Sequence, residues 1–210
     1  MKAKIILLVA AASLLGAFFV KASVTGVTDW GTSSGINCSV QLWDSSGDIV
    51  ITGDVTGLGR MWGTITTSDT QDPTLSIANS IDNDSSFAWT AYIVNVSMYN
   101  PFTILSASAS VPPSSDWTAT ITPPVYVGGG VYTGVIDYQG GTPVAIAPGP
   151  YSELDFSYQV QFTGATSYSL TESVIPVPEP ATFSLLAAGG LLLVGGKVAR
   201  RRQGKLRVSA

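Results

Sequence analysis

The sequence predicts an all-β protein in which two sheets pack into a sandwich between two apolar terminal segments. Three observations predict it. Ser, Thr, Gly, Val and Ile dominate the middle of the chain together with five Trp residues, and β-branched and aromatic residues favour strands. Apolar and polar residues alternate with a period of two in several runs. Clusters of Gly, Pro, Asn and Asp interrupt these runs roughly every 8–15 residues, with no helical period between the termini.

Several runs are expected to form strands, about nine or ten in all. The clearest is 153–162, in which five apolar residues alternate strictly with polar ones and so predict one buried and one solvated face. Runs 116–122 and 61–66 also alternate, the second with large residues on both faces. The longest run, 87–98, has mixed parity, which predicts a central strand covered on both faces or a bulge near Ile93.

Two other stretches are expected to lack regular structure. Gly and Pro are frequent over 140–150, which predicts a long loop before the last strands. Pro is frequent over 171–180, which predicts an extended and exposed linker after a sandwich domain that covers 23–170. A domain of this size is large enough to bury a core of its own.

Charge divides the chain into three parts. Residues 23–180 contain all 14 acidic residues and a single basic one, Arg60, for a formal charge of −13. The first 22 residues carry +3 and the last 14 carry +6, so the net charge of −4 conceals a strong asymmetry. Because nucleic-acid binding needs clustered Lys and Arg, the middle of the chain is not expected to bind nucleic acid.

Residues 1–22 are typical of a secretory signal peptide. Lys2 and Lys4 form a basic start, residues 5–20 are apolar and uncharged, and Ala22 is a suitable small residue before the cut. The alternative is an uncleaved anchor, because the apolar run is only slightly shorter than the about 20 residues that a spanning helix needs.

Residues 181–198 are expected to form a transmembrane segment. As a helix these 18 residues would be about 27 Å long, close to the about 30 Å of a hydrocarbon core. The basic residues of the tail 199–210 follow directly and would hold that end in the cytoplasm. An ordinary C-terminal anchor and a buried helix are the alternatives.

The C-terminal segments occur in a recognisable order: Pro178-Glu179-Pro180, a short apolar span, and an Arg cluster at the extreme end. This order resembles the PEP-CTERM sorting signal of exported bacterial proteins. The resemblance implies that a membrane enzyme, exosortase, recognises Pro178, Glu179 and Pro180 and removes the tail. It also implies that the retention signal consists of Arg200, Arg201 and Arg202.

A second resemblance concerns the middle of the chain. The string from 73 to 92 is similar to a strand pair of exported bacterial sandwich domains that carry this tail. Those domains resemble immunoglobulin-like sandwiches, so the expected fold is an immunoglobulin-like or jelly-roll-like β-sandwich, flanked by an N-terminal signal helix and a C-terminal transmembrane helix.

The residue types exclude the commonest catalytic sites. The chain has no His and a single Cys, so the usual zinc, Ser-His and Cys-His sites are excluded. The best remaining pair is Glu153 and Asp155, about 6.6 Å apart by strand rise on one wet face. A retaining glycosidase needs its carboxyl groups about 5–5.5 Å apart, but acids on such a face are more often plain surface. We therefore do not expect an enzyme.

No cofactor is expected, and calcium is the alternative. The turn 82–86, Asp-Asn-Asp-Ser-Ser, is rich in the oxygen ligands that Ca²⁺ prefers, yet it has neither the central Gly nor the terminal Glu of an EF-hand loop. Asp44, Asp48 and Asp54 flank an expected hairpin and are interpreted as a solvated face. An acidic turn between strands needs no metal.

Trp62 is the candidate ligand-binding residue. An exposed indole next to Thr64 and Thr66 offers an aromatic face to a sugar ring, whereas Trp89 and Trp117 are expected in the core. Cys38 has no partner cysteine, so in an oxidising exterior we expect it either to be buried or to link two chains.

Together these features predict an exported, non-enzymatic cell-surface or extracellular-matrix protein of the kind found in biofilms. The alternative is a carbohydrate-binding module that acts in the exopolysaccharide matrix. The expected partners are an exosortase-type processing enzyme, the membrane before processing and, in the alternative, extracellular polysaccharide. The protein is expected to cross the inner membrane, to be anchored there transiently, and then to reach the cell surface or the exterior.

Overall fold

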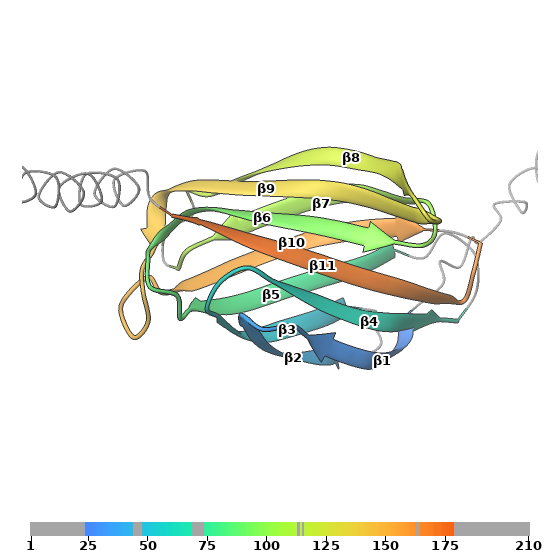
Figure 1. Cartoon of the computed structure of the whole chain (residues 1–210), viewed down its shortest axis with the longest axis horizontal. Helices are drawn as coiled ribbons and strands as arrows, with labels where there is room; N and C mark the ends of the chain where they lie inside the picture. Colours follow the sequence, from blue (N-terminus) through green and yellow to red (C-terminus); the bar gives the residue numbers. More distant parts are fainter. Residues whose placement is uncertain are drawn as a thin grey trace, which may run out of the picture.

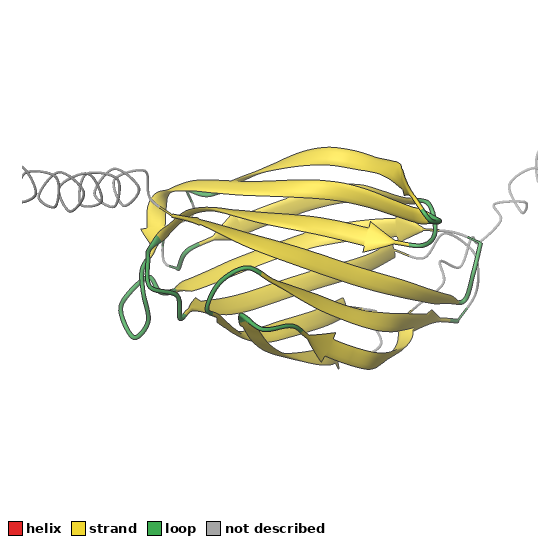
Figure 2. Cartoon of the chain, in the orientation of Figure 1, coloured by secondary structure: helices red, strands yellow, loops and turns green. Residues whose placement is uncertain are grey.

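The computed structural model describes residues 24–43, 48–68, 74–112, 114, 116–162 and 164–178. Within them the chain is all-β, with two sheets packed as a sandwich, which confirms the predicted fold class (Figures 1 and 2). The expected signal helix and transmembrane helix lie outside the described residues. No helix long and apolar enough to cross a membrane occurs in the described part of the chain.

The described residues form eleven strands. In spatial order the six-stranded sheet contains β1 (Val24–Thr32), β4 (Gly59–Thr67), β11 (Ser167–Pro178), β6 (Trp89–Met98), β9 (Val131–Val144) and β8 (Thr118–Gly128). The five-stranded sheet contains β2 (Ile36–Trp43), β3 (Asp48–Val55), β5 (Thr74–Asn83), β10 (Glu153–Phe162) and β7 (Phe102–Ser110). The described pairings are antiparallel except for β3 with β5, which is parallel.

The core lies between the two inner faces. In β10 the alternation predicted for 153–162 is confirmed, because its five alternating apolar side chains are all buried. Aromatic side chains from both sheets meet at the centre: the ring of Phe156 lies 5.2 Å from those of Tyr92 and Tyr138, measured between centroids. Trp89 and Trp117 belong to the core as predicted. Burial of such large side chains is the main source of stability in a sandwich.

The mixed parity of run 87–98 comes from an irregularity and not from coverage on both faces, because the outward side chains from Ile93 to Ser97 are only half-buried. Strand β6 lies between β11 and β9 in the middle of its sheet, and its register against β9 shifts between Trp89 and Ala91. The irregularity therefore lies two residues before the predicted bulge at Ile93. It lets Trp89 and Tyr92, which have opposite parity, both point into the core.

The long loop expected over 140–150 is shorter than predicted. Strand β9 continues through Gly140 and Gly141 to Val144, and the connection to β10 covers only 145–152. The two glycines do not form a turn; Gly140 is needed because the side chain of Trp117 packs closely against its backbone. A Cβ atom on Gly140 would lie 2.1 Å from the indole of Trp117, whose Nε1 donates a hydrogen bond to the carbonyl oxygen of Thr142 at 2.8 Å. The glycine makes room for the ring.

The linker predicted for 171–180 is wrong over 171–178. These residues form most of β11, which pairs with β4 on one side and β6 on the other. Alternate side chains along it are buried, including Leu170, Val174 and Pro176, so the sandwich ends at Pro178 rather than at residue 170. The prolines predicted an extended, exposed linker, but Pro176 and Pro178 stand at the end of the strand, where a missing N–H costs little.

The two ends of the described chain lie at opposite ends of the sandwich. Val24 at the start of β1 pairs with Thr67, near the start of β11, whereas Pro178 pairs with Trp89. In Figure 1 the end of β11 is at the left and the start of β1 at the right.

Candidate functional site

Trp62 stands on the outer face of the six-stranded sheet and is 41% exposed, as predicted. Its indole lies over the backbone of Gly31 on the edge strand β1, where a Cβ atom would come within 2.6 Å of the ring. Thr64 and Thr66 share its face of β4, and Thr66 donates a hydrogen bond to the carbonyl oxygen of Gly26 at 3.2 Å. Trp62 therefore offers an aromatic surface held against a rigid strand.

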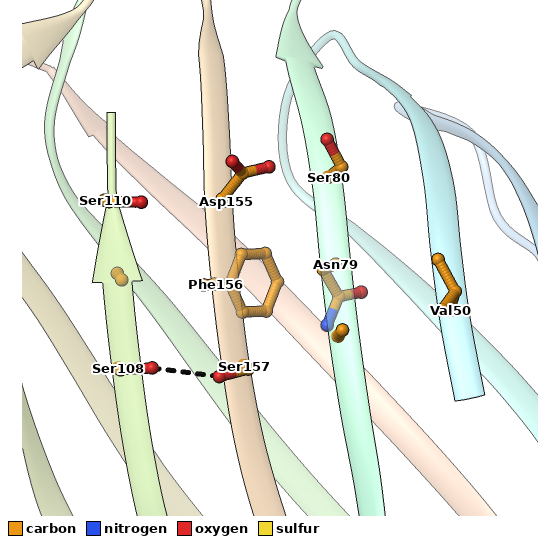
Figure 3. A pocket seen from close by; sticks show the side chains of 10 residues that line it. Val50, Asn79, Ser80, Ser108, Ser110, Asp155, Phe156 and Ser157 are labelled. Carbon is orange, nitrogen blue, oxygen red and sulfur yellow. Dashed lines mark hydrogen bonds between the residues drawn. The ribbon is translucent and has the colours of Figure 1, made fainter. Parts of the chain in front are cut away.

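Glu153 and Asp155 lie on the outer face of the five-stranded sheet, as their spacing predicts. Glu153 accepts a hydrogen bond from the hydroxyl of Ser80 on β5. Asp155 lines a shallow groove of about 430 Å³ with small side chains around it, and Ser108 and Ser157 are hydrogen-bonded across this groove at 2.9 Å (Figure 3). Small side chains, mostly Ser and Ala, therefore surround Asp155, whereas Glu153 lies opposite Asp82 of β5.

The acidic turn 82–86 uses its oxygen atoms to build the fold. Asn83 is buried, and its side-chain oxygen accepts hydrogen bonds from the backbone N–H and the hydroxyl of Ser85, at 3.0 and 2.6 Å. Its amide group donates to the carbonyl oxygens of Phe87 and Val144. The hydrogen bond from the N–H of Ser85 to the side chain of Asn83 is that of an Asx-turn, which Asn favours. Among the described residues no group of three or more His, Cys, Asp or Glu is placed to hold a metal ion.

Several carboxylates nevertheless come close together at this end of the five-stranded sheet. Asp82 faces Glu153 on β10 and Asp54 on β3 across the ladder. Partial burial raises the pKa of Asp82, and the neighbouring charges of Glu153, Asp54 and Asp84 raise it further. Asp48 and Asp54 belong to the predicted hairpin of β2 and β3, whereas Asp44 lies outside the described residues.

Glu172 is the one fully buried carboxyl group of the described chain and was not among the predicted site residues. It lies at the inner face of β11, opposite Met61 on β4 and Val96 on β6. Neither carboxyl oxygen has a well-formed hydrogen bond. Burial raises the pKa of Glu172 to about 7, an effect that the nearby hydroxyl of Tyr158 partly opposes. The sequence does contain a signal for this burial. Glu172 is in phase with Tyr168, Leu170 and Val174, which alternate with more polar residues and point into the core.

Other polar groups share this interior with Glu172. The hydroxyls of Tyr92 and Tyr158 and the side-chain amide of Asn79 are also buried without a hydrogen-bond partner. Burial raises the pKa of both tyrosines, and the charge of Glu172 adds to it. Cys38 is half-buried; burial, followed by Asp54 and Glu172, raises the pKa of its thiol to about 12. This thiol is therefore a poor nucleophile.

The predicted sorting motif, Pro178-Glu179-Pro180, begins at the end of β11. The last residues of β11 pair with β6 as Pro176 with Tyr92, Val177 with Ala91 and, after a register shift, Pro178 with Trp89. Pro176 is buried, and neither proline has an N–H to donate to the ladder. Glu179, Pro180 and the Arg cluster at 200–202 lie outside the described residues.

The described part of the chain is thus an all-β sandwich whose last central strand leads directly into the C-terminal sequence. A protein-family profile identifies the tail as a PEP-CTERM protein-sorting motif, which matches residues 176–203. Exosortase-dependent sorting, by way of a membrane-anchored signal and towards the cell surface, follows from this motif. Comparisons with curated proteins and with solved structures gave no match.

Proposed function

We propose that this chain is a non-enzymatic protein of the cell surface or extracellular matrix, released from its anchor by cleavage of the PEP-CTERM tail. One observation carries the proposal: the sorting motif begins inside the fold, at Pro176 of β11, so the sandwich itself is the cargo of the tail. A charge of −13 over residues 23–180 would keep this cargo hydrated and soluble outside the cell.

The chemistry of the described residues supports a non-enzymatic role. Glu172, whose carboxyl pKa is suited to acid–base chemistry near neutral pH, is fully enclosed between the sheets, so no substrate reaches it. Asp155 is the one carboxylate among the described residues that line its groove, and most of its neighbours there are Ser and Ala. The exposed acids therefore serve solubility in this proposal.

The mature protein is expected to begin near Ser23 and to end just beyond Pro178. A cut before Pro178 would remove residues that pair with β6 in the centre of a sheet, whereas a cut after it leaves the sandwich complete. Mass spectrometry of the intact protein from cell-surface and culture fractions measures both ends. Recovery of a surface protein that still ends at Ala210 would contradict the proposed processing.

A carbohydrate-binding module is the second candidate, and the exposure of Trp62 favours it. An indole held against Gly31 is already ordered and open to solvent, so stacking on a sugar ring would cost little conformational entropy.

For this candidate, Trp62→Ala is expected to weaken binding to polysaccharide severalfold, because aromatic contacts contribute about 0.5–1.5 kcal/mol. Affinity gel electrophoresis against a panel of polysaccharides measures the retardation. Leu58→Ala is the control, since Leu58 is 69% exposed and lies in the connection between β3 and β4. Equal retardation of both variants and the wild type would remove Trp62 from the binding surface.

A further inference from the structure

A polar groove of about 230 Å³ lies on the outer face of the six-stranded sheet, the same face as Trp62. Its floor is β11, which contributes Ser169, Thr171 and Ser173. Arg60 of β4 lies at one end of this row, opposite Ser173, and Tyr99, directly after β6, lies near the other. The four residue steps from Ser173 to Ser169 make the floor about 13 Å long. The groove is therefore long enough for a short stretch of a chain-like ligand.

Arg60 gives the groove its only positive charge. It is the single basic residue between Lys21 and Lys197 in the sequence. Its backbone is fixed on both sides, because its N–H donates to the hydroxyl of Ser33 at 2.8 Å and its carbonyl accepts from the N–H of Ser33 at 2.9 Å. Within the described part of the chain no carboxylate forms an ion pair with it. A guanidinium with five donors thus stands exposed, with no counter-ion among the described residues.

The remaining lining offers hydroxyl groups and one aromatic ring. The hydroxyl of Ser97 is hydrogen-bonded to that of Thr133 at 2.8 Å. In the described structure the hydroxyls of Ser169, Thr171 and Ser173 have no protein partner, so they can donate to and accept from a ligand. The ring of Tyr99 is 64% exposed and forms a wall close to Gly130. Hydroxyl-rich ligands with a flat apolar face match this lining.

The acidic residues lie mostly elsewhere. The outer face of the five-stranded sheet carries five of them: Asp48, Asp54, Asp82, Glu153 and Asp155. Among the described residues no carboxylate lines the groove that contains Arg60, although Asp137 of β9 lies on the same face of the sheet outside the lining. Because exposed charges farther apart than about 8–10 Å are largely screened at moderate ionic strength, the negative charge of the opposite sheet does little to repel an anion here.

We propose that this groove binds a carboxylate-bearing saccharide, such as two or more linked units of a uronate-containing acidic polysaccharide. The guanidinium of Arg60 holds the carboxylate of one unit, and the hydroxyls of β11 bond to the sugar hydroxyls along the groove. The ring of Tyr99, near the other end, packs against the face of a different unit of the same ligand. The proposal deepens the second candidate function, on which it rests, by naming the ligand class and a subsite next to Trp62.

The test compares oligogalacturonate with its fully methyl-esterified form, which has the same sugar backbone without the charge. Titration calorimetry on the full chain in detergent is expected to show binding of the acidic form and at least about tenfold weaker binding of the ester. Arg60→Gln should reduce the affinity for the acid to that for the ester, whereas Arg60→Lys should retain part of the difference. Tyr99→Ala should weaken binding of both forms, with Tyr151→Ala, at an exposed tyrosine in the connection between β9 and β10, as its control.

The outcomes separate the two proposals. Binding that prefers the acid and disappears with Arg60→Gln supports the groove. Binding of equal strength for the acid and the ester, or binding unaffected by Arg60→Gln, overturns the groove while leaving the carbohydrate-binding function intact. Binding of neutral polysaccharides but not of acidic ones would likewise overturn the groove and leave the carbohydrate-binding function intact. Failure to bind any saccharide, in protein whose thermal unfolding is normal, overturns both.

Discussion

A chain that ends at Thr166 is expected to remain unfolded, whereas a chain that ends at Pro178 is expected to fold. The difference is β11, which lies between β4 and β6 in the middle of the six-stranded sheet. Without it β1 and β4 lose their connection to the rest of that sheet, and the buried side chains of Tyr168, Leu170 and Val174 are lost from the core. At about 1.5–3 kcal/mol for each large apolar side chain, together with two ladders of hydrogen bonds, this loss is comparable with the total stability of a domain, about 5–15 kcal/mol.

Near-ultraviolet circular dichroism and urea unfolding of the two truncated chains measure this difference. Both chains should begin at Ser23 and keep the four residues 163–166 that precede β11, so that they differ only in β11. A cooperative transition with an unchanged midpoint in the shorter chain would contradict the central position of β11. Adding a synthetic peptide of residues 167–178 to the shorter chain is a useful second measurement, since restored ellipticity would show that the missing strand, and not aggregation, caused the loss.

The position of β11 also links folding to sorting. The sheet cannot be completed until residue 178 has left the translocation machinery. Only Glu179 and Pro180 then separate the sandwich from the predicted transmembrane segment 181–198, and two extended residues span about 7 Å. Exosortase would therefore meet the motif next to a folded domain. This spacing fits a signal that is read after the cargo has folded.

Much of the fold could be predicted from the sequence because burial in a sandwich follows the side-chain period of two. Strand β10 alternates without exception and was predicted with its boundaries. Strand β11 follows the same period, but Glu172 occupies a core position and two prolines end the strand, so the pattern resembled a linker. Gly140 was interpreted as part of a loop because the sequence does not show that Trp117 packs against it. Both errors come from contacts between distant segments.

Among the candidate sites, too, only the one that depends on local sequence could be predicted. The exposure of Trp62 could be predicted because it depends on the local alternation of β4. The groove at Arg60 could not be predicted, because its lining comes from β4, β11, the end of β6 and the start of β9. These segments are far apart in the chain and meet only through the order of strands in the sheet. Sequence reasoning identified Arg60 as the single cation of the exported part without showing what surrounds it.

Glu172 is expected to make the folded protein less stable as the pH rises from about 4.5 to about 7. Its pKa is near 4.5 in the unfolded chain and about 7 in the sandwich, so over this interval the folded state binds a proton that the unfolded state has released. Stability therefore falls with rising pH and becomes constant above about 7. The difference between the two pKa values corresponds to about 3 kcal/mol. The neighbouring Cys38, Tyr92, Tyr138 and Tyr158 have pKa values raised above their usual ones, so none of them titrates in this interval.

The variant Glu172→Gln is expected to remove this dependence, because an amide of nearly the same shape carries no charge at any pH. It should stabilise the protein by up to about 3 kcal/mol at pH 8 and change the stability little at pH 4, where the wild-type carboxyl is protonated. Urea unfolding between pH 4 and pH 8.5 measures both curves. Asp29→Asn is the control: Asp29 is an exposed carboxylate at a positive φ of 54°, which Asn also tolerates, so its curve should follow the wild type. If Glu172→Gln loses as much stability with rising pH as the wild type does, the buried carboxyl is not the group responsible, and the dependence comes from another carboxyl whose pKa is raised in the fold, such as Asp82.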